Sequence, residues 1–290
     1  MKKKILIIGG SGLLGKRLNE FLEKTDYEVY ATYHQNPIKK KGYFQLNITR
    51  KPDVIFIMKK IAPHIIIHTA ADTNVDRCEI NRKSAYEINV QGTKNVAVAS
   101  ENVGAKLMYI STDYVFDGKK GCYKEIDATN PINYYGVTKF EGEETVKTIC
   151  SDFIIARTAV VYGYNKKNFA TWIIERLKKG NKINIVDDQY ISPTLNVDLA
   201  EQLMAIIEND KQGVFHTAGA ERINRYEFAI RIANSFDLDK TLINSVKMSD
   251  MNWVASRPYD SSLNVSKISR MKKPYNIRKA IQILKDEMRI

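Results

Sequence analysis

The stretch KILIIGGSGLLG, residues 4–15, decides the fold of this chain. It begins with a continuous apolar run, ILII, which is typical of a strand buried on both faces of a parallel sheet. Gly9, Gly12 and Gly15 follow at G-x-x-G-x-x-G spacing and lead into an amphipathic segment. Glycines let the backbone turn sharply and approach a phosphate, and the N–H groups of a helix start face the anion. The order of strand, glycine turn and helix therefore predicts a nucleotide-binding loop, with a purely structural turn as the alternative.

The composition is that of a globular protein. Hydrophobic residues make up 44% and charged residues 27% of the 290 residues, which suffice for one large domain or two smaller ones. No apolar run approaches the ~20 residues of a membrane span, and the basic start is not followed by a signal peptide's apolar segment. We therefore expect a cytoplasmic protein with no membrane partner. The widely spaced Cys78, Cys122 and Cys150 are expected to be reduced thiols.

The net charge of +12 raises the question of nucleic-acid binding. The lysines are spread along the chain, and no module of alternating basic and aromatic residues concentrates them. A solvated basic surface and an anionic small-molecule substrate are the alternatives. We expect no nucleic-acid partner.

Apolar runs alternate with helical patterns along the chain. Strands are predicted at 5–8, 28–33, 43–46, 65–68, 106–110, 153–156, 183–186 and 213–217. Helices are predicted at 13–22, 51–61, 84–103, 169–179 and 197–207. This alternation predicts an α/β fold with a Rossmann-type doubly wound parallel sheet.

The character of the sequence changes after Arg157, where the regular alternation ends. We expect residues 1–160 and 190–220 to form an NAD(P)-binding Rossmann domain. Residues 161–189 and 221–290 would form a smaller α/β substrate-binding cap from discontinuous segments.

The residues that follow the 28–33 strand bear on the choice of cofactor. An acidic residue there would bind the adenosine ribose hydroxyls of NAD. The sequence instead runs Tyr33-His34-Gln35-Asn36 and then has three lysines at 39–41, which favours the 2′-phosphate of NADPH. The alternative is that these lysines are a solvated loop and that the protein accepts NADH as well.

Two further strand ends could contact the cofactor. Asn47 and Ile48, after the third strand, could reach the adenine. The small residues from Thr69 to Thr73 suit a cofactor that crosses the sheet edge, although close helix–strand packing would explain them equally well.

Asn89 lies within a helical pattern, where it could hold a local break and order a water, or simply make a packing hydrogen bond.

Tyr135 and Lys139 form a Y-x-x-x-K pair, which places both side chains on one face of a helix. A neighbouring ammonium stabilises a phenolate and lowers the tyrosine pKa, so that Tyr135 becomes a usable general acid toward a carbonyl oxygen. Thr112, at the end of the fifth strand, could hydrogen-bond the same oxygen, with Ser111 as the competing candidate. The adjacent Tyr134 lacks the four-residue offset from the lysine.

Longer motifs surround these residues in a fixed order. They are GGSGLLG at 9–15, TAADTNVD at 69–76, INVQGTKN at 88–95, STDYVFDG at 111–118, NYYGVTKFEGE at 133–143, RTAVVYG at 157–163, QYISPT at 189–194 and RPYDSSL at 257–263. With them the chain resembles the extended short-chain dehydrogenase/reductases and, more narrowly, the dTDP-4-dehydrorhamnose reductase family. The resemblance implies hydride transfer from NADPH or NADH to C4 of a nucleotide-activated 4-keto sugar, dTDP-4-dehydro-6-deoxy-L-mannose, giving dTDP-L-rhamnose.

The resemblance also implies roles for individual residues. The implied catalytic set is Thr112, Tyr135 and Lys139, with Tyr135 donating the proton. The implied cofactor contacts are Gly9, Ser11, Gly12, Leu13, Leu14, Gly15, His34, Asn47, Ile48, Thr69, Ala70, Ala71, Thr73, Tyr135 and Lys139. The implied substrate contacts are Thr73, Val75, Thr112, Asp113, Val160 and Arg257. The resemblance is compatible with a homodimer.

Three positions depart from the family pattern. Val160 stands where the family usually has a tryptophan that contacts the nucleotide-sugar, Asp260 replaces an asparagine, and Asn47 replaces an aspartate. The four histidines are scattered, and we expect no metal site.

Two alternative functions follow from related families. The regulatory β subunit of methionine adenosyltransferase resembles the same family, and the valine at position 160 suits a non-catalytic NADP-binding subunit. A nucleotide-sugar epimerase or dehydratase is the other alternative. A dehydratase typically has Asp-Glu after its threonine, whereas this chain has Asp113-Tyr114.

Overall fold

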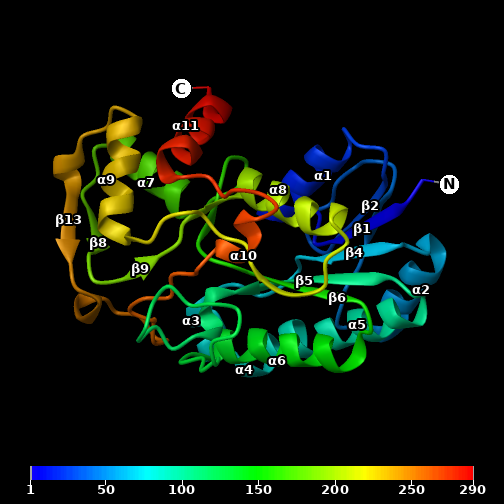
Figure 1. The fold of residues 1–290 in the computed structure, drawn as a ribbon. Helices are drawn as coiled ribbons and strands as arrows, with labels where there is room; N and C mark the ends of the chain where they lie inside the picture. The colour runs from blue at the N-terminus through cyan, green and yellow to red at the C-terminus, as the bar shows by residue number, and fades with distance from the viewer. Residues whose placement is uncertain (1, 290) are drawn as a thin grey trace.

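The structure, a computed structural model, describes residues 2–289. Its centre is a seven-stranded parallel sheet with the order β11-β6-β5-β4-β1-β2-β3 (Figure 1). The strands are β1 (Lys4–Ile8), β2 (Glu28–Tyr33), β3 (Tyr43–Gln45), β4 (Ile65–His68), β5 (Lys106–Thr112), β6 (Phe153–Thr158) and β11 (Gly213–His216). The direction of winding reverses at β1, so a crevice opens at its carboxyl end. The predicted Rossmann-type doubly wound sheet is confirmed.

Helices cover both faces of the sheet (Figure 1). One face carries α1 (Leu13–Leu22) and α8 (Asn196–Glu208), and the other carries α2 (Lys51–Ile61), α5 (Thr93–Asn102) and α6 (Tyr134–Ile149). The side chains of β1 alternate between the two cores: Ile5 and Ile7 pack under α1, whereas Leu6 and Ile8 pack on the opposite side. All four are buried, which explains the unbroken apolar run that opens the chain.

The predicted helix 84–103 is divided into three parts. They are α4 (Arg82–Tyr86), the π-helical turn η1 (Glu87–Gly92) and α5. Asn89 lies inside η1, and its side chain bonds both backbone groups of Asp72 and the Thr138 hydroxyl. The expected break is present, and protein groups satisfy the amide. The helix α3 (Val75–Ile80), which Asn74 caps, was not predicted.

The cap forms a second layer beside the sheet (Figure 1). Its elements are α7 (Phe169–Lys178), β8 (Ile183–Val186), α9 (Arg225–Ser235), β13 (Ile243–Val246) and α11 (Ile277–Met288). Strands β8 and β13 pair in parallel, and the three helices share one apolar core with them. The remaining short elements are η2 (Asp113–Val115), β7 (Val161–Tyr162), β9 (Tyr190–Ile191), β10 (Thr194–Leu195), β12 (Ile223–Asn224), η3 (Lys240–Leu242), η4 (Met248–Asp250) and α10 (Ser266–Ser269).

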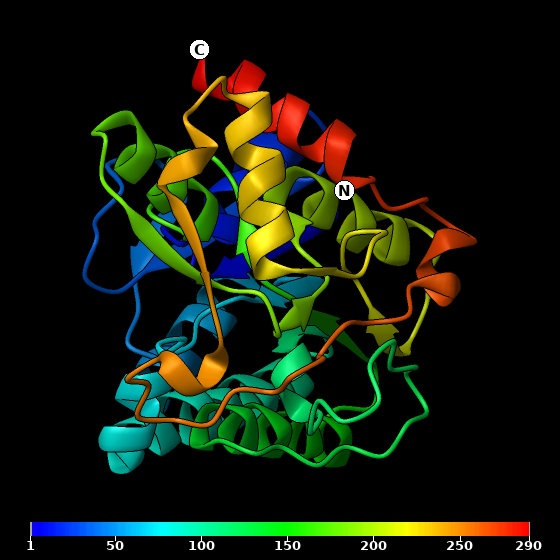
Figure 2. The ribbon, with the colours of Figure 1, turned by 90° about the vertical axis from the view of Figure 1, so that its left-hand side faces the viewer.

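The segment after β13 returns from the cap to the sheet domain and runs past α3 (Figure 2). There the Asp76 carboxylate accepts hydrogen bonds from the backbone N–H groups of Val254, at 3.1 Å, and Ala255, at 3.0 Å. Farther on, Ile268 packs in the core between the sheet and the helices α1 and α8. It therefore belongs to the sheet domain, although it lies in the range 221–290 that was expected to form the cap. The C-terminal region therefore contributes to both layers.

Candidate active site

Two adjoining cavities lie at the carboxyl ends of the parallel strands. Cavity 1, of about 450 Å³, is lined by the loops that follow β1, β2, β3 and β4. Cavity 2, of about 540 Å³, is lined by the ends of β5 and β6, the start of α6 and the first residues of α7 and α9. Gly12, Thr69, Ala71 and Lys166 line both. A ligand that spans the two cavities would cross the sheet at its switch point, as a dinucleotide does.

The glycine loop is built for close approach of a ligand to the backbone. Gly9 has φ +92°, and a Cβ there would lie 2.7 Å from Thr69 Oγ1. A Cβ on Gly15 would lie 2.2 Å from the Gly9 carbonyl oxygen, so only a residue without a side chain lets the first turn of α1 pack against the loop. The N-cap residue of α1, Gly12, has no side chain to cap the helix, and the first turn contains no acidic residue. Its N-terminal N–H groups are thus left for an anion, which fits the pyrophosphate of a dinucleotide.

We expect Gly15→Ala to damage both stability and cofactor binding. The added methyl group cannot fit against the Gly9 carbonyl without moving the loop, which should cost about 1–3 kcal/mol of unfolding free energy. The displaced loop should raise the Kd for NADPH about tenfold or more, measured by fluorescence titration. Gly104→Ala is the control for cofactor binding: Gly104, unlike Gly15, has a positive φ, but a Cβ there would meet nothing within 4 Å. Equal NADPH affinity in the two variants would contradict the role given to Gly15.

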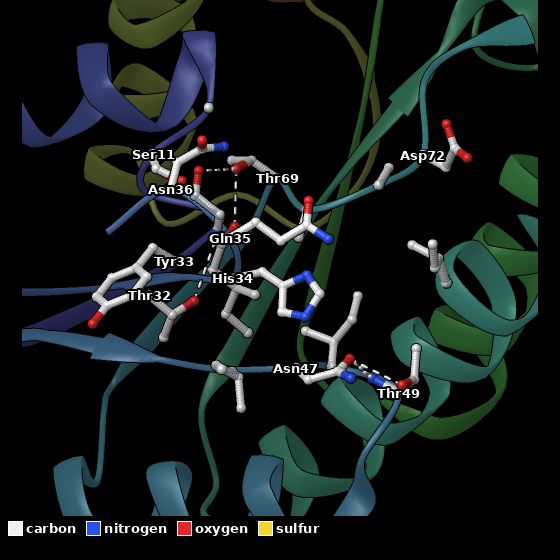
Figure 3. A pocket seen from close by; sticks show the side chains of 18 of the residues that line it. Ser11, Thr32, Tyr33, His34, Gln35, Asn36, Asn47, Thr49, Thr69 and Asp72 are labelled. Carbon is white, nitrogen blue, oxygen red and sulfur yellow. Dashed lines mark hydrogen bonds between the residues drawn. The ribbon is translucent and has the colours of Figure 1, made fainter. Parts of the chain in front are cut away.

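Cavity 1 has a polar wall at the end of β2 (Figure 3). The His34 ring and the Gln35 side chain lie there between Ser11 and Asn47. No acidic residue follows β2, as the sequence indicated. The lysines at 39–41, which favoured NADPH, line neither cavity; Lys40 pairs with Glu23 instead. Any preference for a 2′-phosphate must therefore come from other residues of this wall.

Cavity 2 brings the predicted catalytic residues together. Tyr135 and Lys139 come from the first turns of α6, and Thr112 comes from the end of β5. Asn133 caps α6 by accepting a hydrogen bond from the Gly136 N–H at 2.8 Å. A Cβ on Gly136 would lie 2.2 Å from the Tyr114 carbonyl oxygen. The absence of this side chain lets the start of α6 press against η2.

Burial is the main influence on the Tyr135 hydroxyl. It raises the pKa of Tyr135 well above the ordinary value, while the Thr112 side chain opposes this by hydrogen bonding and the Asp113 charge adds to it. The expected net lowering of this pKa is wrong for the arrangement observed, because desolvation by burial is the largest influence and raises it. The raised pKa keeps Tyr135 protonated at neutral pH, which is the form that a general acid needs.

Lys139 is buried and has few partners. Its Nζ donates to the Ile110 carbonyl oxygen at 2.8 Å and lies 4.0 Å from the centroid of the Tyr109 ring. Burial lowers the pKa of Lys139 to about 7, and the negative charge of Glu143 opposes that shift. The ammonium is therefore close to losing its proton at neutral pH.

Asp113 is a buried carboxyl group beside the catalytic residues. It accepts hydrogen bonds from Thr112 Oγ1, at 3.0 Å, and from Ser261 Oγ. Burial raises the pKa of Asp113 to about 6, against the effect of these hydrogen bonds and of the Arg225 charge. Asp113 is thus ionised at neutral pH and faces the cavity.

The structure brings together most of the predicted contact residues. Those in cavity 1 are Gly9, Ser11, Gly12, His34, Asn47, Ile48, Thr69, Ala70 and Ala71. Those in cavity 2 are Gly12, Leu13, Leu14, Thr69, Ala71, Thr73, Val75, Thr112, Asp113, Tyr135, Lys139 and Val160. Gly15 and Arg257 line neither. Arg257 pairs with Asp76 at 2.9 Å and lies over the Trp253 ring, so it holds the returning C-terminal segment against α3.

Val160 has a strained backbone. Its φ is +39°, in the left-handed region, where a β-branched residue is a genuine outlier. Its side chain packs against the cap core, and its carbonyl oxygen accepts a hydrogen bond from Thr194 at 3.2 Å. Strain of this kind costs about 1–3 kcal/mol and is found mostly at functional sites. The position where the family usually has tryptophan is therefore a rigid turn in the wall of cavity 2.

Sequence reasoning predicted a substrate-binding cap but did not identify the cap residues that line cavity 2. The residues concerned are Lys166, Lys167, Asn168, Phe169 and Arg225. They stand at the starts of α7 and α9, which the capping side chains of Asn168 and Asn224 mark. These caps could have located the helix starts in the sequence, but only the fold brings the two starts together. With Lys139, the basic residues of this cavity outnumber its one carboxylate, Asp113, which suits an anionic ligand.

Other predicted features concern the chain as a whole. Cys78, Cys122 and Cys150 are all free thiols. Within the described part of the chain, no three His, Cys, Asp or Glu side chains gather in a way that could hold a metal ion. None of the helices in residues 2–289 has the length and apolar character needed to cross a membrane.

Comparison with known proteins gives one family match. The chain matches the family described as the RmlD substrate binding domain over residues 2–290. The dTDP-4-dehydrorhamnose reductase of Aggregatibacter actinomycetemcomitans is 34% identical over 280 residues, which cover 92% of each chain. Methionine adenosyltransferase 2 subunit beta of Bos taurus is 30% identical over 278 residues, covering 93% of this chain and 82% of that protein.

Solved structures show the same similarity. The crystal structure of dTDP-4-dehydrorhamnose reductase from Bacillus anthracis, in complex with NADP, aligns with a TM-score of 0.91. It is 34% identical and covers 99% of this chain and 100% of that one.

Proposed function

The chain belongs to the RmlD substrate binding domain family, and on this premise we propose that it is a dTDP-4-dehydrorhamnose reductase. The reaction is the NADPH-dependent reduction of the C4 keto group of dTDP-4-dehydro-6-deoxy-L-mannose to give dTDP-L-rhamnose. One observation carries the proposal: Thr112, Tyr135 and Lys139 line one cavity directly beside a glycine loop that fits a dinucleotide. The basic residues of the cap helix starts supply the charge that a sugar diphosphate needs.

The chain's own residues supply the acid catalysis. When bound, the cofactor supplies a hydride to C4. Tyr135, kept protonated by its burial, donates its proton to the carbonyl oxygen as that oxygen gains charge. Thr112, whose hydroxyl donates to Asp113 in this structure, would turn that hydroxyl to the same oxygen, and the Lys139 ammonium would stabilise the phenolate that remains.

The other site residues hold the two ligands. The glycine loop and the residues of cavity 1 would bind the cofactor, with NADPH favoured because no carboxylate follows β2. The reductase from Bacillus anthracis, solved with NADP, supports this choice. Thr73, Val75, Asp113 and Val160 would contact the sugar nucleotide. These four residues lie in the expected cofactor-binding range, 1–160 with 190–220, whereas Lys167 and Arg225 come from the expected cap, 161–189 with 221–290, so the sugar nucleotide would lie between the two layers.

We expect His34→Asp to weaken the preference for NADPH. The side chain lies in the polar wall at the end of β2, where a carboxylate would repel a 2′-phosphate and could bind ribose hydroxyls instead. The ratio of kcat/KM for NADPH to that for NADH should fall about tenfold or more, since like charges in contact are costly. His34→Asn, which adds no charge, should change the ratio much less. If both variants kept the wild-type ratio, His34 would not contribute to cofactor choice.

The direct test is turnover of purified protein. NADPH absorbance should fall when dTDP-4-dehydro-L-rhamnose is added, and dTDP-L-rhamnose should accumulate in equal amount. An absence of turnover with both NADPH and NADH would overturn the proposal. Tightly bound cofactor that is not consumed while the sugar is converted would indicate an epimerase or dehydratase instead.

A second candidate is a non-catalytic regulatory subunit. The similarity to methionine adenosyltransferase 2 subunit beta and the unusual residue at position 160 favour it. In that case the protein would bind NADPH without turnover and would co-purify in equal amount with a methionine adenosyltransferase catalytic chain. As a reductase the chain would act in the cytoplasm, and sedimentation would establish whether it forms a homodimer.

A further inference from the structure

Helix α6 carries a third buried ionisable residue on its catalytic face. Glu143 follows Lys139 by four residues, as Lys139 follows Tyr135, so the three side chains succeed one another along one face. Glu143 is fully buried, with 0% of its side chain exposed. A buried carboxylate is costly unless it is paired and hydrogen-bonded. Its position next to the catalytic lysine therefore calls for an explanation.

The Glu143 carboxylate is clamped from two strands. Arg157, at the end of β6, donates from Nε to Oε1 at 2.9 Å and from Nη2 to Oε2 at 2.7 Å. Ser111, at the end of β5, donates from Oγ to Oε1 at 2.6 Å. A bidentate pair of this geometry fixes the carboxylate in one orientation. Because Ser111 precedes Thr112, the same clamp ties the end of β5 to α6.

The surroundings of Lys139 offer little else to balance its charge. The titratable and charged groups around it are Tyr135 and Glu143 on α6, Tyr109 on β5, His68 on β4, Asp113 on η2 and, behind Glu143, Arg157 on β6. Burial lowers the pKa of His68 to about 3 and raises that of Tyr109, so both are neutral at pH 7. Asp113 is hydrogen-bonded by Thr112 and Ser261. Glu143 lies one helical turn from Lys139, and its negative charge raises the pKa of Lys139 against the effect of burial.

The packing leaves only 3% of Lys139 exposed, at the edge of cavity 2. Gly142 lacks the Cβ that would lie 2.3 Å from the Tyr109 hydroxyl oxygen, so the Tyr109 ring packs close to α6. That ring and the Ile110 carbonyl oxygen then hold the ammonium in place. Neither carries a full negative charge, and neither can replace the solvation that the ammonium has lost.

We propose that Glu143 is a positioning residue whose carboxylate keeps the buried Lys139 ammonium protonated. Arg157 and Ser111 hold this carboxylate one helical turn beyond the lysine. The catalytic consequence rests on the proposed function, because a protonated Lys139 is what stabilises the Tyr135 phenolate. Loss of the carboxylate would let Lys139 release its proton at lower pH, and the reductase would lose activity there.

The protonation of Lys139 can be measured without turnover. Trace labelling with acetic anhydride at a series of pH values, followed by mass spectrometry of the peptide that contains Lys139, gives the midpoint of its titration. We expect a wild-type midpoint near 7 and, in Glu143→Gln, a midpoint lower by about one pH unit or more. The alkaline limb of kcat/KM against pH should move in the same direction by a similar amount.

Matched variants separate the effect of the Glu143 charge on Lys139 from a structural effect of the substitution. Ser111→Ala removes a hydrogen bond to Glu143 but leaves its charge, so the midpoint should stay near the wild-type value. Glu144→Gln removes the neighbouring carboxylate, which pairs with Lys147 at the surface, and should leave the midpoint unchanged. Glu143→Asp keeps the charge and should recover part of the shift.

Each outcome bears on the proposal. If Glu143→Gln does not fold, the comparison is made in the Arg157→Met background, where adding Glu143→Gln removes the carboxylate alone and should lower the Lys139 midpoint relative to Arg157→Met. An unchanged Lys139 midpoint on loss of the Glu143 carboxylate, in either background, would overturn the role of Glu143, even if the wild type reduces the sugar. A shifted midpoint in a protein without reductase activity would support Glu143 and overturn the proposed function alone.

Discussion

Tyr135→Phe should lower kcat by about 100- to 10,000-fold while the protein stays folded and binds NADPH. The substitution removes one oxygen atom and leaves the ring, which packs edge-on against Tyr114 with 6.0 Å between ring centroids. Neither Thr112 nor Asp113 can take over this role. Thr112 has a hydroxyl pKa far too high for proton transfer to compete, and Asp113 is ionised above pH 6. The measurement is the steady-state rate of NADPH consumption with dTDP-4-dehydro-L-rhamnose.

Tyr134→Phe provides the matched control for that experiment. Tyr134 is the adjacent residue of α6 and loses the same atom, but its ring lies beneath Arg82 and lines neither cavity. We expect wild-type kcat and KM in this variant. Full activity in Tyr135→Phe, or an equal loss in both variants, would remove Tyr135 from the role of general acid.

The elements of the sheet could be predicted because their signals are local. The bounds predicted for α2 and β4 agree with those observed, 51–61 and 65–68. Buried parallel strands require apolar side chains on both faces, and a glycine turn requires residues without Cβ atoms. Both requirements can be seen in the residues themselves. The Y-x-x-x-K spacing is equally local, so the side of α6 that faces the cavity could also be inferred.

The electrostatics of the site could not be predicted in the same way. The expected lowering of the Tyr135 pKa considered one neighbour, Lys139, whereas the observed shift depends on the burial of the whole side chain. The lysines at 39–41 had the right charge in the right part of the sequence, yet they line neither cavity. The position of a charged residue in the sequence does not give its distance from another group or the extent to which either is buried, and both determine a pKa.

The cap was the least predictable part because its contacts are long-range. Lys167, in the loop before α7, and Arg225, the first residue of α9, line the same cavity although they are far apart in the sequence. Arg257, expected at the substrate, is engaged by Asp76 instead. The left-handed backbone of Val160 has no signature in residue type, since valine rarely adopts it. Tertiary packing alone places these residues.

Arg157→Met should lower the free energy of unfolding by about 3–5 kcal/mol. Only 3% of the Arg157 side chain is exposed, and its guanidinium group is the positive partner of the Glu143 carboxylate. Without it, the carboxylate remains buried with one hydrogen bond, from Ser111. The unfolded chain hydrates both charges fully, so the penalty falls on the folded state. Urea unfolding at neutral pH, analysed for the midpoint at constant slope, measures the loss.

The double variant Arg157→Met with Glu143→Gln decides whether the loss comes from an unpaired charge. It replaces both ions by neutral side chains, so it should be more stable than Arg157→Met alone, because a buried pair replaced as a whole costs far less than a broken one. Lys147→Met is the control for removal of a cation from α6. It breaks the exposed pair with Glu144 and should cost at most about 1 kcal/mol. If the double variant were as unstable as the sum of the two single variants, the clamp would act through packing and not through charge.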